Sequence, residues 1–354
     1  IDGYMPGGGG RPDIAPLPRW TARYLMTQDR RAKVPTLGTG EQAGSFGIHY
    51  RDKSTDLPIS LDTYPNATIM GTTNIFPSCG GSCSTPYTPD VAHQPSMSYV
   101  PYLVTGDYFH LEELQFWANW NLFYWGDHGG SQGLMVNDQI RAQAWGLRTL
   151  GHAAFITPDD HPLKAYFLSK LANNLGWYDR NVVGDPPTPL GYLPNPGGLG
   201  LDNTFATWMD DFFTWTVGHL VNLGFTDAQG IFDYKVKFPD GRMTDPGYCW
   251  IIAGTYWTPA RDPDTGQTFQ NWDDYRVAVI RNWDREAFSE WFLPPNMSSA
   301  NEDPLIAAEC NSTEMANLLG MRRGDMIGGS WSHEGYPSNL QPAVAMAAER
   351  GVPN

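Results

Sequence analysis

Two adjacent carboxylates, Asp210 and Asp211, are the first candidates for chemistry in this sequence. A pair of carboxylic acids can divide general acid and general base work in the hydrolysis of a glycosidic bond. Neighbouring residues of a helix point about 100° apart, so these two cannot serve the same glycosidic oxygen. Glu334 is the best second carboxylate, and Asp62 is the next. Alternatively, both aspartates only stabilise the start of a helix. Three flanking residues are candidate sugar ligands: Trp208, Trp331 and His333.

His93 and Tyr99 form a second group, at the start of an expected helix. The positive end of the helix dipole favours the neutral form of histidine, which can act as a base. His93 and Tyr99 are therefore candidates for proton abstraction. The alternative is that His93 only caps the helix.

A third group lies on one face of an expected helix. Arg141, Trp145, Arg148 and His152 are spaced by four, three and four residues, which places them on one side. Guanidinium groups bind carboxylates through paired hydrogen bonds, and aromatic rings stack on sugars. The face suits an acidic sugar, but the arginines could instead pair with acids of a neighbouring helix. Further candidate ligands are His49, Tyr50 and Asn119.

These groups must be positioned by helical hairpins, because a helix, a tight turn with Thr or Asp, and a second helix recur at least four times. The hairpins are expected at residues 22–32, 93–125, 140–177 and 210–238. Stacked helical hairpins permit few folds. We therefore expect a mainly α chain, an (α/α) toroid-like barrel with long loops rich in Pro, Gly and aromatic residues.

The hairpins also define the domain organisation. Residues 1–19 carry four consecutive glycines and several prolines and predict an extended arm. Residues 20–354 predict a single toroid domain, with a long loop insertion at 36–92 and a last short helix at 342–350. A loop of that length in a compact domain is usually functional or disordered, and its aromatic content argues against disorder.

Composition excludes several classes of protein. The 354 residues carry a net charge of −15, and adjacent basic residues occur only as two short pairs, so nucleic acid is not an expected partner. No apolar run is long enough to span a membrane. Histidines do not show metal-binding spacing and no phosphate-binding loop occurs, so neither a metal nor a cofactor is expected. The 14 Trp, 17 Tyr and 16 Phe suit sugar faces, but also cores and interfaces.

Four cysteines suggest an oxidising compartment. Cys79 and Cys83 are spaced for a small local disulfide, which leaves Cys249 and Cys310 to pair, although four buried thiols are the alternative. Three Asn-x-Ser/Thr triplets are compatible with secretion. An extracytoplasmic location (secreted, periplasmic or cell surface) is therefore expected for a chain that is either processed or a piece of a longer one.

Two segments resemble the (α/α)-toroid carbohydrate-active enzymes, which comprise six-hairpin glycosidases and toroid polysaccharide lyases. The hairpin around residues 102–112 is one, and Trp208-Met-Asp-Asp-Phe-Phe is similar to the helix start of unsaturated glucuronyl hydrolases, where an Asp is the acid/base. The resemblance to toroid lyases implies an Asn, a His, a Tyr and an Arg around a uronate, and four residues would fill these roles: Asn119, His93, Tyr99 and Arg141. The chain departs from the family in showing four or five hairpins where a closed ring needs six or seven.

Three functions follow as expectations. The first is a glycan-degrading enzyme that binds a polysaccharide or oligosaccharide, either a glycoside hydrolase using Asp211 and Glu334 or a lyase that cleaves uronate-containing chains by β-elimination. The second is a non-catalytic structural protein of a filament, surface layer or virion, with the N-terminal arm joining a homo-oligomer. The third is a glycan- or peptide-binding module without catalysis.

Overall fold

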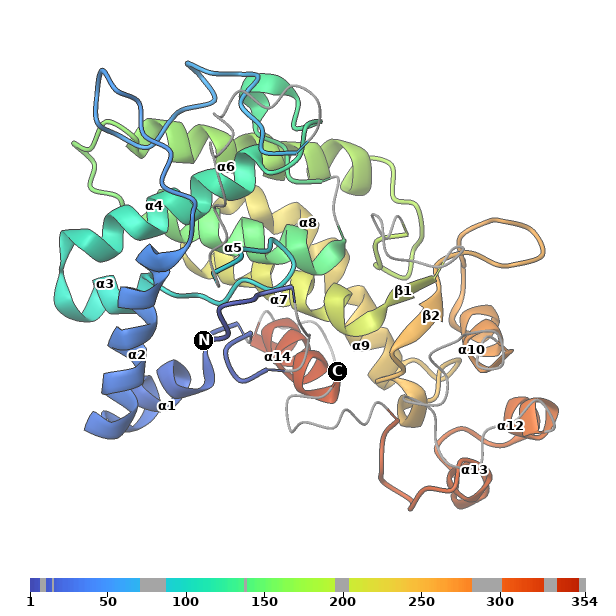
Figure 1. Cartoon of the computed structure of the whole chain (residues 1–354). Helices are drawn as coiled ribbons and strands as arrows, with labels where there is room; N and C mark the ends of the chain where they lie inside the picture. The colour runs from blue at the N-terminus through green and yellow to red at the C-terminus, as the bar shows by residue number, and fades with distance from the viewer. Residues whose placement is uncertain are drawn as a thin grey trace. The chain divides into compact units, whose positions relative to one another are not determined.

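The fold is taken from a computed structural model, which describes residues 1–6, 11–14, 16–70, 87–136, 139–194, 204–281, 301–327 and 336–349. These residues are mainly helical, as predicted (Figure 1). They divide into two compact units. Unit 1 comprises Ile1–Trp177 and His219–Asp227, and unit 2 comprises Tyr178–Gly218 and Ala228–Asn354. A single closed toroid is not confirmed by this division and remains a prediction.

The first predicted hairpin of unit 1 is confirmed. Helix α1 (Arg19–Thr27) is followed by α2 (Arg30–Gln42), and the Asp29 side chain caps α2 by accepting from the Arg31 N–H at 2.8 Å. Helix α2 continues to Gln42, so the prediction that the long loop begins at residue 36 was wrong. One of its glycines, Gly40, serves packing, because a Cβ there would lie 2.8 Å from the side chains of His110 and Pro101.

The second hairpin consists of α3 (Tyr99–Thr105) and α4 (Tyr108–Phe123). Asp107 accepts from the Phe109 N–H at 3.0 Å, which confirms the predicted cap. Helix α3 begins at Tyr99 rather than at residue 95. Helix α4 is buried on nearly every face, as its apolar sequence predicts.

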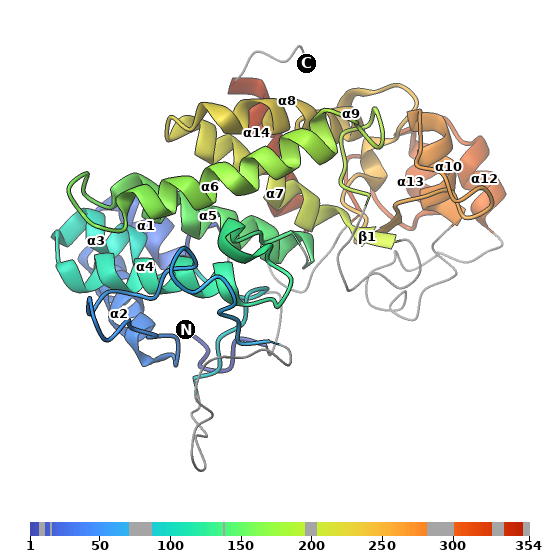
Figure 2. The same cartoon turned by 90° about the horizontal axis from the view of Figure 1, so that it is seen from above.

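The third hairpin comprises α5 (Ile140–Ile156) and α6 (Lys164–Tyr178). Every residue of α5 from Ile140 to Ala154 is buried, and α5 runs along α4 (Figures 1 and 2). Gly151 of α5 meets Leu220, where a Cβ would lie only 2.1 Å from a Leu220 methyl carbon. Two largely buried helices, α4 and α5, therefore form the centre of unit 1.

The loop at residues 46–70 is fastened to these helices by charged side chains. Arg51 forms a two-pronged ion pair with Glu112 of α4, at 2.8 and 2.6 Å. Lys170 of α6, itself buried, pairs with Asp62. The arm joins the same unit, since Thr88 donates to the Gly3 carbonyl at 2.8 Å and accepts from the Met5 N–H at 3.2 Å.

Unit 2 combines short helices with one antiparallel pair of strands, β1 (Thr204–Ala206) and β2 (Trp257–Pro259). Helix α7 (Thr207–Asn222) begins in unit 2, and its last four residues belong to unit 1. Among the described residues of unit 2, the remaining helices are α8 (Gln229–Lys235), α9 (Lys237–Thr244), α10 (Trp272–Arg281), α12 (Glu302–Ala307), α13 (Thr313–Leu318) and α14 (Tyr336–Glu349). The fourth predicted hairpin is thus confirmed as α7 and α8, while α10, α12 and α13 were not predicted because they are short and lie between prolines and glycines.

Single-turn helices complete the described secondary structure: η1 (Ala43–Ser45), η2 (Gly130–Gln132), the π-type η3 (Asp179–Val183), η4 (Thr226–Ala228) and η5 (Trp250–Ile252). The predicted disulfide between Cys249 and Cys310 is present and links the segment after α9 to the segment before α13. Cys79 and Cys83 lie outside the described residues. Within the described ranges, no helix is both long and apolar enough to cross a bilayer.

Candidate functional site

A carboxylate–histidine pair, Asp90 and His93, lies in unit 1 just before α3. The Nδ1 atom of His93 lies 3.0 Å from Oδ1 of Asp90, and the same oxygen accepts the Ala92 N–H at 2.6 Å. Within the described part of the chain, Nε2 of His93 makes no hydrogen bond. A carboxylate that accepts from Nδ1–H fixes the ring and leaves Nε2 as a proton acceptor. His93 therefore has the geometry of a general base, and it does not begin the helix as predicted.

Arg141 of α5 lies near this pair and acts on Asp90. Burial raises the pKa of the Asp90 carboxyl, but the hydrogen bond and charge of His93, the Ala92 N–H and the charge of Arg141 outweigh it. The net pKa of Asp90 lies below its ordinary value, so the carboxylate stays charged near neutral pH. The sequence indicated His93 and Arg141 but missed Asp90, which the Asp-x-x-His spacing could have revealed.

A small hollow adjoins this group, at the ends of α4 and α5. Its volume of about 10 Å³ is at the lower limit for a single water molecule. Val91 and Ala142, the chain neighbours of Asp90 and Arg141, line it together with Asn121, Trp125, Met135 and Gly146. The half-buried ring of Trp125 is thus close to the segment that carries His93.

Arg148 lies deeper in unit 1 and is not exposed to solvent. Its guanidinium donates to the carbonyl oxygens of Gln94 at 3.3 Å and Pro16 at 3.5 Å, while Nε has no hydrogen-bond partner. Within the described residues it forms no ion pair with a carboxylate. Burial lowers the pKa of Arg148 to about 9, so the group remains charged at neutral pH. Arg148 has no exposed surface with which to contact a polymer, so its predicted substrate-binding role is not supported.

Two histidines and a tyrosine gather next to Arg148. Tyr99 stacks on His152 with ring centres 3.6 Å apart, and Nε2 of His152 lies 2.8 Å from Nε2 of His219. Burial, the neighbouring His219 and the charge of Arg148 lower the pKa of His152, and burial with Arg148 lowers that of His219 to about 4. Burial also raises the pKa of Tyr99, which makes it a phenol rather than a base at neutral pH.

Other predicted ligands of unit 1 hold the fold together. Asn119 accepts the Tyr166 hydroxyl at 2.7 Å and donates to the Ile59 carbonyl. His49 contacts both carboxylate oxygens of the buried Glu113, at 3.0 and 2.9 Å. Tyr50 packs edge-on against Phe123. These three residues fasten the 46–70 loop to the helices and are not grouped with His93.

Asp210 and Asp211, the predicted catalytic pair, lie in the core of unit 2. Asp210 pairs with Lys235, Asp211 pairs with Arg242, and all four side chains are at most 1% exposed. Burial raises the pKa of Asp211, while Arg242 and Lys235 oppose the rise. Carboxylates held this way have no access to a glycosidic oxygen, so the observed geometry does not support them as catalytic groups.

The predicted aromatic sugar platforms are also enclosed. Trp145 is 1% and Trp208 is 7% exposed. Stacking on a sugar needs an open ring face, and rings this enclosed do not offer one, because both tryptophans fill the centres of their units. Three further predicted site residues lie outside the described residues: Trp331, His333 and Glu334.

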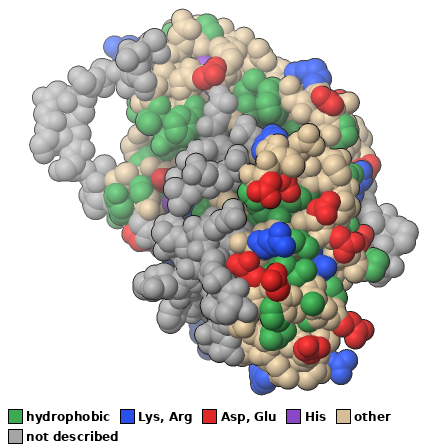
Figure 3. Space-filling view, turned by 90° about the vertical axis from the view of Figure 1, so that its right-hand side faces the viewer, with side chains coloured by type: hydrophobic (Ala, Val, Ile, Leu, Met, Phe, Trp, Pro, Cys, Tyr) green, Lys and Arg blue, Asp and Glu red, His purple; other side chains and the backbone are tan. Residues whose placement is uncertain are grey.

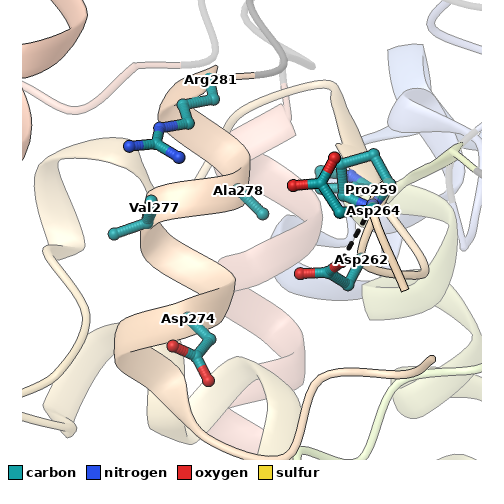
Figure 4. Close-up of a pocket in the computed structure, with 8 residues that line it drawn as sticks. Pro259, Asp262, Asp264, Asp274, Val277, Ala278 and Arg281 are labelled. Atoms are coloured by element: carbon teal, nitrogen blue, oxygen red, sulfur yellow. Dashed lines mark hydrogen bonds between the residues drawn. The ribbon is translucent and has the colours of Figure 1, made fainter. Parts of the chain in front are cut away.

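Figure 4 shows a wider hollow in the described part of unit 2, of about 270 Å³. Helix α10 contributes Asp274 and Arg281, and the loop after β2 contributes Asp262 and Asp264. Asp262 accepts the N–H groups of Asp264 at 3.0 Å and Thr265 at 2.8 Å, so it closes its own turn. Within the described ranges, no group of three or more His, Cys, Asp or Glu side chains is arranged to hold a metal. This hollow lacks a histidine among its lining residues and is a weaker candidate than the His93 group.

The face in Figure 3 bears acidic and basic side chains intermingled, with no extended basic area among the coloured residues. Comparison with known proteins gives no matching family model, no similar curated protein and no similar solved structure.

Proposed function

We propose that the chain is a glycan-degrading enzyme that cleaves a uronate-containing polysaccharide by β-elimination, with His93 as the base. The observation that carries the proposal is the Asp90–His93 pair, in which Nε2 of the 8% exposed His93 makes no hydrogen bond within the described residues and Arg141 lies nearby. The resemblance to the (α/α)-toroid lyases suggests the same chemistry. An extracytoplasmic location, compatible with the Cys249–Cys310 disulfide, belongs to this proposal.

The reaction requires a base and a positive charge. His93 Nε2 takes the proton from C5 of the uronate, the electrons form a C4–C5 double bond, and the bond from C4 to the glycosidic oxygen breaks. Water protonates the leaving oxygen. Arg141 offsets the charge that develops on the uronate carboxylate, and Asp90 stabilises the imidazolium that forms.

β-Elimination fits these residues better than hydrolysis. Hydrolysis by Asp211 would need a carboxylate that reaches a substrate, and Asp211 is paired with Arg242 inside unit 2. Burial keeps Tyr99 protonated, so His93 is the better base of the two.

The test is an incubation of the purified chain with neutral and uronic polysaccharides, followed by assays for new reducing ends and for ultraviolet absorbance of an unsaturated uronate. We expect ultraviolet product from a uronic polysaccharide. The variant His93→Gln should lower kcat about a hundredfold or more. His161→Gln, a half-buried histidine in the turn between α5 and α6, is the matched control and should keep its activity. Reducing ends without ultraviolet product would indicate a hydrolase instead, and full activity of His93→Gln would remove His93 from the mechanism.

One observation favours a second function, an assembly protein. Large apolar side chains are exposed near the ends of the first two hairpins of unit 1: Leu25 (43%), Met26 (85%), Val34 (64%), Leu103 (54%) and Tyr108 (54%). Exposed apolar groups of this kind are typical of protein interfaces. Defined oligomers of the purified chain, together with no cleavage of any polysaccharide, would support this function.

A further inference from the structure

We propose that Arg148 is a positioning residue for the Asp90–His93 pair, an inference that rests on the proposed function of that pair. Arg148 does not contact solvent, so it cannot bind the substrate directly. Its hydrogen bonds instead reach main-chain carbonyl oxygens, that of Gln94, which follows His93, and that of Pro16 in the N-terminal segment. The role of the guanidinium is therefore to hold other groups in place.

The segment that Arg148 holds is the one that carries His93. Gln94 follows His93 directly, and its carbonyl oxygen accepts from Nη2 of Arg148 at 3.3 Å. The Gln94 side chain exchanges two hydrogen bonds with Asn121 of α4, at 2.6 and 3.2 Å, and accepts from the Thr149 hydroxyl at 3.4 Å. Helices α4 and α5 therefore hold Gln94 in place through hydrogen bonds to its main chain and to its side chain. Because the main chain next to His93 is held in place, Nε2 of His93 stays in one position, and proton transfer requires such a fixed position.

The buried charge of Arg148 distinguishes a positioning role from a purely structural one. A buried ion without a counter-ion is unfavourable, and an apolar side chain of similar volume is usually tolerated at least as well. Arg148 forms no ion pair within the described ranges, and its hydrogen bonds are long. A residue that served stability alone would not need the charge. Arg148→Met should therefore fold, with a melting temperature equal to that of the wild type or higher.

Tests of the position of His93 do not need a substrate. In nuclear magnetic resonance spectra of the full chain, we expect the hydrogen bond to Asp90 to protect the Nδ1–H of His93 from exchange. Arg148→Met should make this proton exchange about tenfold faster or more, because the segment opens more often. Arg148→Lys, which keeps one charged donor, should restore part of the protection. Unchanged exchange in Arg148→Met would overturn the proposal, whatever the activity.

The kinetic test follows on a substrate that the wild type cleaves. Arg148→Met should lower kcat by about tenfold to a hundredfold with little change in KM, because Arg148 orients the base without touching the sugar. A rise in KM with kcat unchanged would overturn the positioning role. Thr149→Val removes the second contact of α5 with Gln94 and keeps the volume, so it should change the exchange rate and kcat in the same direction as Arg148→Met, but by less.

If Arg148→Met does not fold, the role is structural and the proposal fails. If the wild type cleaves no polysaccharide, the proposed function fails, while the exchange experiment still decides the positioning role.

Discussion

Acid should destabilise this protein through the buried pair His152 and His219, and replacing His219 by Gln should remove much of the effect. The ring of His219 contacts His152 at 2.8 Å, and Arg148 lies close enough to disfavour a second positive charge. Glutamine can still hydrogen-bond to His152 but cannot be protonated in this pH range. His219→Gln thus removes one titrating group and keeps a polar partner for His152.

The sign and the magnitude follow from the pKa of His219. Burial and Arg148 lower it to about 4 in the folded chain, whereas an unfolded histidine has a pKa of about 6.5. Below pH 6.5 the unfolded chain therefore binds more protons, so the stability is complete above about pH 6.5 and is lost as the pH falls toward 4. When the pH falls from about 7.5 to about 5, protonation of His219 in the unfolded chain should lower the free energy of unfolding by about 2 kcal/mol. The pKa of His152 is lowered too, which adds a loss of the same sign.

The assay is urea denaturation of wild type and His219→Gln at both pH values, followed by tryptophan fluorescence. The difference between the two proteins at pH 5 and at pH 7.5 isolates the contribution of His219 from other titrating groups. His161→Gln should change the pH dependence less, because His161 is less buried. A ring titration of His219 near pH 6.5, or equal pH dependence of wild type and His219→Gln, would refute the reasoning.

Two further predictions concern unit 2. Arg242→Met leaves Asp211 buried without its partner, so it should cost about 3–5 kcal/mol of the free energy of unfolding, measured by urea denaturation. If Arg242→Met loses less than about 1 kcal/mol, the pair does not stabilise the core as inferred. Replacing both Cys249 and Cys310 by Ser opens a loop with a sequence separation of 61 and should cost about 4 kcal/mol through the entropy of the unfolded chain. An unchanged unfolding midpoint in this double variant, compared with the oxidised wild type, would contradict the entropic argument.

Helices of unit 1 were predictable from the sequence because their signals are local. Asp29 and Asp107 each accept an N–H two residues later, and such caps can be recognised from residue type and spacing alone. The extent of α2 was missed in part because the reason for Gly40 is tertiary: it lies against His110 and Pro101 of other elements. Short helices such as α12 carry too few residues for a periodic signal.

The candidate site was predictable only in part, because residue type does not determine burial or partners. His93 and Arg141 were indicated by their chemistry, and the structure relates both to Asp90, which no sequence pattern had singled out. Asp211 and Arg148 have equally suitable chemistry, but one is paired with a cation in a core and the other is enclosed. Such outcomes depend on contacts between residues far apart in the chain.

The two units alternate along the sequence, and this order affects how the protein folds during its synthesis. Unit 1 needs His219–Asp227, which follow residues 178–218 of unit 2. A nascent chain that has reached Trp177 therefore carries α5 without Leu220 against Gly151 and without His219 beside His152. Domains generally fold as units during translation, and exposed apolar surface favours aggregation. Unit 1 must wait for about 50 more residues to leave the ribosome, several seconds at ordinary rates of translation, with the buried face of α5 incomplete and open to chaperones.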